Sequence, residues 1–318
     1  MVTRRDFLTT TMAAGLGAAL SPLKSLALNN FLEAKIFNVL LGRPTNDSII
    51  ASLLCKQQGL FFLTYGSNKN SLNKKTALIN LNQGEVHEFE LTGLQSNALN
   101  YYKVSYQAKP NVSIITSDVY QFQTAREKGQ PFVFTITADS HLGTIKHCDP
   151  LLYQQTLNNV AKDNPDIHFA LGDEFRASKV KDPNYLKIEA LYHEQREYLG
   201  KLCHQVPYFF ILGNHEMEAK AFDNGTADCL AAWSLKARKK MIPNPVPNHF
   251  YSGNEQENKR QNYYSFEWGD VLFVVLDVFW YSNISSEDEE ISEKAIMENL
   301  SKEERIKLRT CLLYTSEA

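Results

Sequence analysis

Three apolar runs in the middle of the chain each end in a short polar motif, and this arrangement constrains the fold more than any other feature. The runs cover residues 132–137, 167–171 and 208–212, and they are rich in β-branched and aromatic residues. Runs of this length and composition are typical of strands buried on both faces of a sheet. We therefore expect three buried strands that deliver polar side chains to their C-terminal edge.

The motifs are Asp139-Ser140-His141, Gly172-Asp173 and Gly213-Asn214-His215-Glu216. In an extended segment residues i and i+2 point the same way, so Asp139 and His141 can bind one metal ion together. The carboxylate of Asp173 can bridge two ions, and the amide oxygen of Asn214 adds a neutral ligand. Two such ions activate a water for attack on a phosphate ester. The motifs therefore predict a site for two metal ions and a small phosphorylated substrate.

Other polar residues near these motifs have predicted supporting roles. His215 follows a ligand on the substrate side, where it can stabilise the transition state or protonate the leaving group. Glu216 and Arg176 are expected to support the ligands from behind. His147 and His249 are candidates for the rim of the substrate site.

Residues 28–127 form the first predicted domain, which reads as all-β. Short apolar runs are separated by turn-forming residues, a pattern typical of a small β-sandwich. The sequence Leu91-Thr92-Gly93-Leu94, followed by Tyr101-Tyr102-Lys103-Val104, resembles fibronectin type III-like domains. The predicted strands cover residues 36–41, 48–54, 59–65, 86–91, 101–106 and 117–122.

Residues 128–318 form the second predicted domain, in which strands alternate with helical patterns and indicate an α/β core. A hairpin-like turn at residues 268–270 favours a mixed sheet. The basic segment 236–240 is interpreted as a solvated helix face. Helices are predicted over residues 150–163, 184–201 and about 288–309, with further strands over 263–267 and 271–276.

Residues 1–27 read as a targeting segment. Thr3-Arg4-Arg5-Asp6-Phe7-Leu8 resembles a twin-arginine export signal, and the apolar stretch after it is too short to span a membrane. Lys24 in the cleavage region disfavours the general secretory route, which is the alternative. We therefore expect the twin-arginine machinery as a partner, a periplasmic or extracellular location, and no membrane span in the mature chain.

Charge and cysteine content exclude other classes. The net charge of −3 argues against nucleic acid as a binding partner. The five cysteines form no C-x-x-C pair, so the sequence indicates neither a zinc ribbon nor a disulfide scaffold.

The ordered motifs D-x-H, G-D and G-N-H-[DE] resemble those of the calcineurin-like metallophosphoesterases. With the preceding β domain, the chain is similar to the purple acid phosphatase arrangement. This resemblance implies an α/β fold, a four-layer metallophosphoesterase-type β-sandwich core flanked by helices. It also implies two divalent or trivalent ions, which mixed nitrogen and oxygen ligands allow to be iron, zinc or manganese.

Two departures from that pattern limit the resemblance. Arg176 stands where purple acid phosphatases carry a tyrosine ligand, so we expect no ferric–tyrosinate chromophore. The histidine motifs that complete both metal shells are missing after residue 276. We therefore expect the sequence to be incomplete at its C-terminus, where residues 311–318 need not be native.

Three functions follow from this reading. The first is an acid phosphatase-like phosphomonoesterase. A phosphodiesterase or nucleotide hydrolase of the same superfamily is the second, because leaving-group choice depends on pocket loops that the motifs do not describe. The third is a non-catalytic exported binding scaffold.

Overall fold

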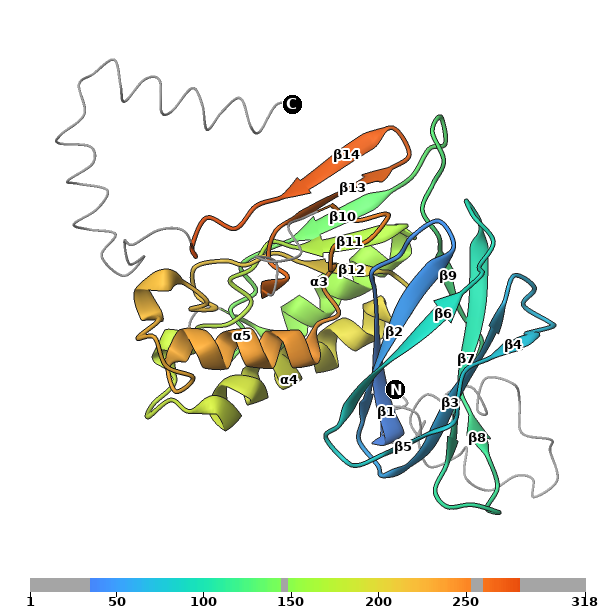
Figure 1. Ribbon diagram of the computed structural model, residues 1–318, viewed down its shortest axis with the longest axis horizontal. Coiled ribbons are helices and arrows are strands. Elements are labelled where there is room, and N and C mark those ends of the chain that lie inside the picture. The colour runs from blue at the N-terminus through green and yellow to red at the C-terminus, as the bar shows by residue number, and fades with distance from the viewer. Residues whose placement is uncertain (1–34, 144–147, 253–259, 281–318) are drawn as a thin grey trace, which may run out of the picture.

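The structure is a computed structural model that describes residues 35–143, 148–252 and 260–280. An all-β part comes first along the chain, and an α/β part follows it (Figure 1). The predicted export signal, His147, the helix over 288–309 and residues 311–318 lie outside the described residues.

The all-β part contains nine strands in two sheets. One sheet has the order β1-β2-β6, and the other has β4-β3-β7-β8 with β5 paired to β3 and β9 paired to β7. Side chains from both sheets meet in one core that includes Leu53, Phe61 and Val104, all fully buried. The strands are β1 (Phe37–Gly42), β2 (Ser48–Cys55), β3 (Gly59–Gly66), β4 (Lys74–Lys75), β5 (Ile79–Leu81), β6 (Val86–Thr92), β7 (Leu99–Gln107), β8 (Ile115–Thr116) and β9 (Tyr120–Gln123).

The sixth predicted strand, over residues 117–122, is the one that differs most from the structure. The chain is interrupted there, because the hydroxyl of Ser117 accepts the backbone N–H of Val104 at 3.0 Å in place of a backbone carbonyl. Such local side-chain bonds compete with a strand ladder. The two short strands β8 and β9 therefore flank Ser117 instead of one continuous strand.

The α/β part is built on a parallel sheet of three strands in the order β10-β11-β12. The pairing sets Phe134 opposite Ile167, and Ala170 opposite Phe210. The elements are β10 (Phe134–Thr137), α3 (Pro150–Lys162), β11 (Ile167–Ala170), η1 (Ala177–Lys179), α4 (Tyr185–Cys203), β12 (Tyr208–Phe210), η2 (Lys220–Phe222), α5 (Leu230–Met241), β13 (Tyr264–Trp268) and β14 (Val271–Val275). All three carboxyl ends of the parallel strands lie at the same edge.

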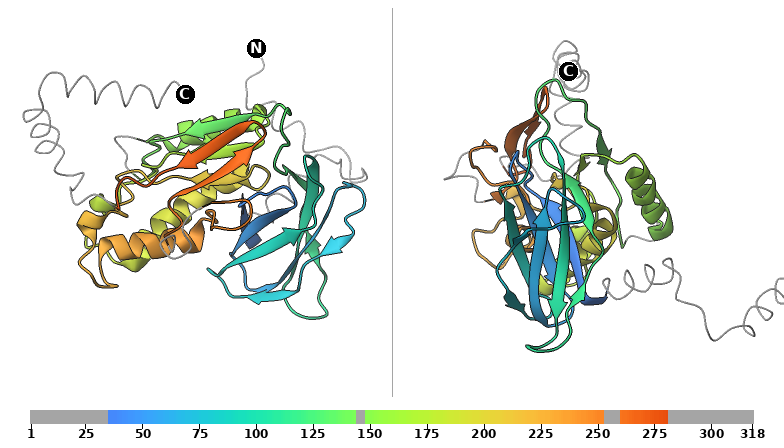
Figure 2. Two further views of the ribbon diagram at one scale, coloured as in Figure 1. Left: turned by 45° about the horizontal axis from the view of Figure 1, so that its top comes forward. Right: turned by 90° about the vertical axis from the view of Figure 1, so that its right-hand side faces the viewer.

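Different layers cover the two faces of this sheet, as Figures 1 and 2 show. Tyr208 and Phe210 face a core shared with the helices. Phe169 and Phe209 face the opposite core, where they stack with Phe266 of β13. Alternation along β12 thus sends Tyr208 and Phe210 to the helices and Phe209 to the hairpin.

The β13–β14 hairpin forms an antiparallel sheet of its own rather than extending the parallel sheet into the predicted mixed sheet. Gly269 takes a positive φ of 61° at its turn, and its backbone N–H donates to the carbonyl of Arg126. Phe266 and Phe273 stack over the parallel sheet with ring centroids 5.2 Å apart. Aromatic packing therefore places the hairpin on the face of the sheet.

Helix α4 joins the two parts of the molecule. Its Arg196, fully buried, donates to Oδ1 of Asn38 at 3.0 Å and to Oγ of Ser52 at 3.1 Å. The same guanidinium donates to the carbonyl oxygens of Ser52 and Met241. The sandwich strands β1 and β2 are thus held to α4 and α5 through one side chain.

The basic segment 236–240 is not wholly solvated, so that interpretation is wrong for Arg238. Arg238 is fully buried, and its guanidinium donates twice to the carboxylate of Glu218, at 2.7 and 2.8 Å. A buried arginine needs acceptors for its N–H groups, here a carboxylate, and the sequence pattern alone did not reveal Glu218.

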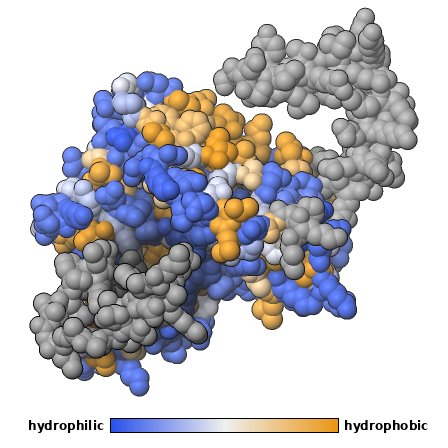
Figure 3. All heavy atoms as spheres, turned by 180° about the vertical axis from the view of Figure 1, so that it is seen from behind, coloured by the Kyte–Doolittle hydropathy of each residue, from blue (hydrophilic) through white to orange (hydrophobic). Residues whose placement is uncertain are grey.

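Apolar residues also gather at the top of the face shown in Figure 3, the end of the molecule that carries β10 and β14 in Figure 1. Exposed apolar side chains of this region include Phe134, Ile136, Leu272 and Val274. In the part of the chain that the structure describes, no helix combines the length and the apolar character needed to cross a bilayer.

Candidate metal centre

The loops that follow β10, β11 and β12 meet at the C-terminal edge of the parallel sheet. Beyond the strands, the backbone N–H of Asp139 donates to the carbonyl of Gly172 at 3.0 Å, and that of His141 donates to the carbonyl of Asp173 at 3.1 Å. The third loop is tied in by the N–H of Ala177, which donates to the carbonyl of His215 at 3.0 Å. The three sequence motifs therefore occupy adjacent, mutually bonded loops, as predicted.

Three of the predicted residues bring potential ligand atoms together. One atom each from His141, Asp173 and His215 lies within 4.8 Å of the others. The rings of the two histidines meet edge to face with centroids 5.1 Å apart. Two imidazoles and a carboxylate suit borderline transition-metal ions such as zinc, iron and manganese.

Asp139 and Asn214 lie beside this group. Oδ1 of Asp139 is 3.6 Å from Nε2 of His141, and its carboxylate is 68% exposed. The amide nitrogen of Asn214 donates to Asp173 Oδ2 at 3.0 Å and to Oδ1 at 3.2 Å in the orientation that satisfies both groups. If the amide of Asn214 were rotated, its oxygen would lie beside the carboxylate of Asp173. A cation could then bind both groups.

The three loops that follow β10, β11 and β12, called the metal-edge loops below, hold uncommon backbone conformations. Asp139, His141 and Asp173 have φ angles of 58°, 47° and 54°, a region that residues other than glycine seldom adopt. Gly172 has a φ of 84°, and a Cβ there would lie 2.0 Å from the backbone nitrogen of Gly213. Strain of this kind concentrates at functional sites, where it fixes the direction of ligand side chains.

Glu216 connects the second and third loops from below. Its fully buried carboxylate accepts the backbone N–H groups of Gly213 at 2.8 Å, Glu174 at 2.9 Å and Asp173 at 3.1 Å. Burial raises the pKa of Glu216 to about 8, although these N–H donors favour its ionised form. This geometry suits the supporting role that the sequence predicts for Glu216.

Glu174 is a buried acid that the three sequence motifs do not include. Its carboxylate accepts the hydroxyls of Ser140 and Tyr153, while Oε1 finds no hydrogen-bond partner among the residues that the structure describes. Burial raises the pKa of Glu174 to about 7. An acidic residue directly after the ligand Asp173 in a buried segment was the signal available in the sequence.

The chemistry of this edge fits a cation. Among the described residues, no lysine or arginine forms an ion pair with Asp173, Glu174 or Glu216. Buried carboxylates are normally paired with a cation or bind a metal ion. The residues present therefore suit a bound metal ion.

Arg176 and His249 occupy different surroundings. Arg176 is partly buried just before η1, and its Nε is buried without a hydrogen-bond partner. His249 instead lines a hollow with Ser96, Glu127 and Gly269, at the end of the hairpin opposite the metal edge. The predicted place of His249 at the rim of the substrate site is therefore wrong.

Comparison with known proteins agrees with this geometry. Residues 132–306, more than half of the chain, match the calcineurin-like phosphoesterase family. The chain belongs to the calcineurin-like phosphoesterase family.

The chain is also similar to two purple acid phosphatases of Arabidopsis thaliana. It is 22% identical to purple acid phosphatase 13 over 240 residues, which cover 68% of this chain and 40% of the relative. It is 23% identical to purple acid phosphatase 15, with 68% and 39% covered. The chain thus spans about two fifths of the length of these curated relatives.

A solved structure described as PhoD shares the fold of the phosphoesterase. The TM-score is 0.55 at 16% identity, and the match covers 77% of this chain and 52% of the PhoD chain. At this identity the likeness concerns the fold alone.

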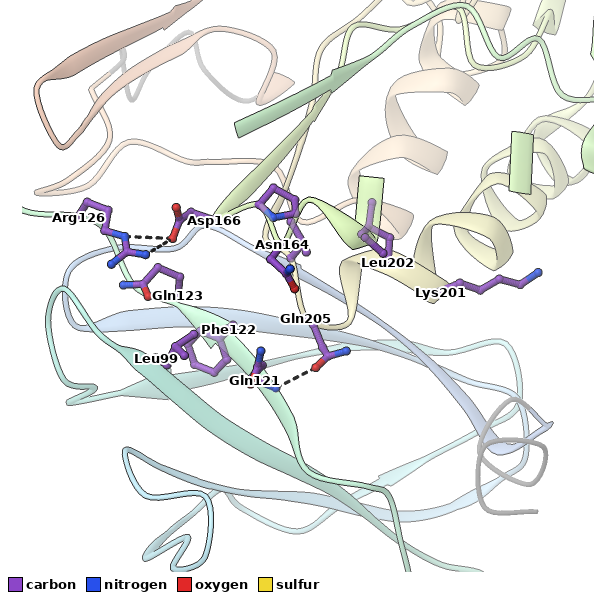
Figure 4. Close-up of a pocket in the computed structure, with 13 residues that line it drawn as sticks. Leu99, Gln121, Phe122, Gln123, Arg126, Asn164, Asp166, Lys201, Leu202 and Gln205 are labelled. Carbon is purple, nitrogen blue, oxygen red and sulfur yellow. Dashed lines mark hydrogen bonds and ion pairs between the residues drawn. The ribbon is translucent and has the colours of Figure 1, made fainter. Parts of the chain in front are cut away.

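A cavity of about 360 Å³ lies at the other edge of the phosphoesterase's parallel sheet, between the sandwich and the helices (Figure 4). Its walls include Gln121 and Gln123 of β9, Gln205 and the ion pair of Arg126 with Asp166, which are 2.6 Å apart. Asp166 and Gln205 precede β11 and β12, whereas the metal loops follow them. The cavity is therefore separate from the candidate metal centre.

Proposed function

We propose that this protein is a metal-dependent phosphomonoesterase of the acid phosphatase type, acting at a site for two metal ions. The group formed by His141, Asp173 and His215 at the edge of the parallel sheet carries the proposal. Membership of the calcineurin-like phosphoesterase family supports it. The substrate class would be small phosphate esters.

Asp139, His141, Asp173 and Asn214 would hold the metal ions, which the nitrogen and oxygen donors allow to be iron, zinc or manganese. Bound ions would supply an activated water nucleophile and offset the negative charge of the phosphate. Asp173 is the side chain that both neighbouring loops can share. It contacts Asn214 and the backbone of His215 on the third loop, and a carboxylate oxygen lies within 4.8 Å of a ring nitrogen of His141 on the first loop.

His215 would hold the proton that the leaving group takes up. Its backbone N–H donates to Oδ1 of Asp173 at 2.9 Å, which fixes the loop that carries its ring. A ring nitrogen of His215 then donates its proton to the oxygen of the leaving alcohol. Because the ring also lies among the candidate ligands, a variant of His215 must be tested for metal content as well as turnover.

The test compares p-nitrophenyl phosphate turnover and bound metal in the wild type, Asp173→Ala and His215→Ala. The matched control is Glu90→Ala, an exposed acid on β6. We expect Asp173→Ala to lose both metal and turnover, and His215→Ala to lose turnover by about 100-fold or more. Equal turnover in all four proteins would overturn the assignment, and faster turnover of bis-p-nitrophenyl phosphate would favour a phosphodiesterase.

The proposal also covers the domain boundaries and the export of the protein. Residues 28–127 would be a fibronectin type III-like domain, supported by the two packed sheets, and 128–318 the phosphoesterase domain. Residues 1–27 would direct twin-arginine export to the periplasm or beyond. Fractionation of cells that express an Arg4→Lys, Arg5→Lys variant tests this, since loss of export is expected only if the arginine pair is the signal.

A further inference from the structure

Arg176 belongs to the loop after β11, the second of the three loops at the candidate metal centre. It follows Asp173 by three residues, and the next backbone N–H, that of Ala177, donates to the carbonyl of His215 at 3.0 Å. On the other side, Leu142 pairs with Phe175 in a parallel bridge, which places the first loop beside the same segment. The backbone around Arg176 is therefore held beside the other two loops of the candidate metal centre.

The guanidinium of Arg176 has no protein partner within the described residues. Its Nε is buried and makes no hydrogen bond, and the ion pairs of this part of the chain do not include it. Arginine remains charged and presents five donors in a planar fork.

The carboxylates of the metal-edge loops already have other contacts. The oxygens of Glu216 accept three backbone N–H groups, and Oδ1 of Asp173 accepts the N–H of His215. Glu174 instead contacts Ser140 and Tyr153. The arrangement leaves a cationic fork available for an anion that enters from outside.

We propose that Arg176 binds the phosphate group of the substrate through two of its non-bridging oxygens. Guanidinium groups match the geometry of phosphate oxygens and form paired, charge-assisted hydrogen bonds with them. This role rests on the proposed function, and it assigns Arg176 to the substrate instead of to the support of the metal ligands. Arg176 positions the phosphorus atom relative to the ligands on the two flanking loops.

The test measures binding of inorganic phosphate by calorimetry, with and without added manganese, together with KM for p-nitrophenyl phosphate. The variants are Arg176→Gln and Arg176→Lys. Lys179→Gln is the matched control, because Lys179 is an exposed cation in the adjacent η1. We expect Arg176→Gln to weaken phosphate binding and raise KM by about 10- to 100-fold, as loss of a charge-assisted bond implies.

Further readouts separate this role from a structural one. Arg176→Lys should fall between wild type and Arg176→Gln, because it keeps the charge without the fork. Metal content and the urea midpoint should be unchanged in both variants, and Lys179→Gln should bind phosphate within about twofold of wild type. Loss of metal or of stability in Arg176→Gln would overturn the proposal.

The outcomes also separate this proposal from the proposed function. An active, metal-loaded wild type whose phosphate affinity survives Arg176→Gln overturns the role of Arg176 alone. Phosphate binding that depends on Arg176 in a protein without turnover supports the anion site while the proposed function fails. Absence of phosphate binding by the wild type, with and without manganese, overturns the role of Arg176.

Discussion

Two buried charged clusters in this molecule differ in how their hydrogen bonds are completed. The first, the Arg196 cluster, consists of Arg196, Asn38, Ser52 and Met241 between the sandwich and the helices. Its guanidinium donates to side-chain and backbone oxygens of these neighbours without any carboxylate. Burial lowers the pKa of Arg196 to about 9, so it is still charged at neutral pH.

The second cluster, the metal-edge cluster, consists of Asp173, Glu174, Glu216, His141 and His215. It gathers three acids with two histidines, and one carboxylate oxygen of Glu174 has no partner. Burial raises the pKa values of Glu174 and Glu216. The Arg196 cluster is complete within the chain, whereas the metal-edge cluster has the composition of a site that a cation completes. The difference distinguishes a structural network from a functional one.

Arg196→Met should have the largest effect, and it tests the structural half of the comparison. The variant keeps the apolar stem but leaves buried acceptors of Asn38 and Ser52 unsatisfied, so we expect a loss of about 3–5 kcal/mol in the free energy of unfolding. Urea unfolding followed by circular dichroism measures it. The control Lys128→Met removes an exposed pair with Glu267 and should cost less than about 0.5 kcal/mol. A loss below about 1 kcal/mol for Arg196→Met would contradict the comparison.

Asp173→Asn should lower metal affinity rather than stability, the reverse of Arg196→Met. We expect metal affinity to fall by at least about 100-fold, more than the loss of a supporting residue alone causes. Stability in a chelator should be unchanged or higher, because a like charge beside Glu216 is removed. Calorimetric titration with zinc or manganese and urea unfolding provide the two readouts. An Asp173→Asn protein that unfolds in chelator but keeps its metal affinity would reverse the assignment of the two clusters.

Local patterns explain which parts of the fold could be predicted from the sequence. The strands β10, β11 and β12 were predictable because each is a short apolar run that ends in a polar motif. The predicted burial was wrong for β10, whose Phe134 and Ile136 are exposed. The hairpin turn at Gly269 was predictable from its own residues. Side-chain period and turn chemistry are properties of neighbouring residues, so a single sequence reveals them.

Long-range contacts explain what could not be predicted. Arg196 reads as a solvated residue of an amphipathic helix, yet its partner Asn38 is 158 positions away in the chain. Arg238 was misread for the same reason, because Glu218 lies 20 residues before it. At the metal edge, Glu174 was missed since its burial depends on Tyr153 of α3. Burial of a charge is decided by tertiary packing, which local periodicity does not encode.

His168 adds a third case to the comparison. Its hydrogen bonds are completed within the chain, as those of Arg196 are, but its ring can take up a proton. Thr135 and Thr137 contact its two ring nitrogens at 2.9 and 3.2 Å, and burial lowers its pKa to about 4. The unfolded chain takes up a proton below a pH of about 6.5 while folded His168 stays neutral, so stability is lost as the pH falls from 6.5 toward 4.

His168→Gln should therefore reduce the loss of stability between pH 7 and pH 5 by about 2 kcal/mol relative to wild type. Gln keeps a donor and an acceptor for the two threonines. Urea unfolding at both pH values measures the difference. An identical loss in wild type and variant would show that other groups, such as partly buried His204, cause the loss of stability at acid pH.

Glu216→Gln should have the smallest effect, and it tests whether the metal-edge cluster depends on its buried support. An amide has one acceptor oxygen, so it cannot replace a carboxylate that accepts the N–H groups of Gly213, Asp173 and Glu174. We expect the loops to shift and metal affinity to fall by about 10-fold, with His215 still present. Metal titration of Glu216→Gln against wild type measures this, and Glu90→Gln serves as the exposed control. Unchanged affinity would mean that the strained loops keep their ligand geometry without Glu216. Metal binding would then depend only on His141, Asp173 and His215.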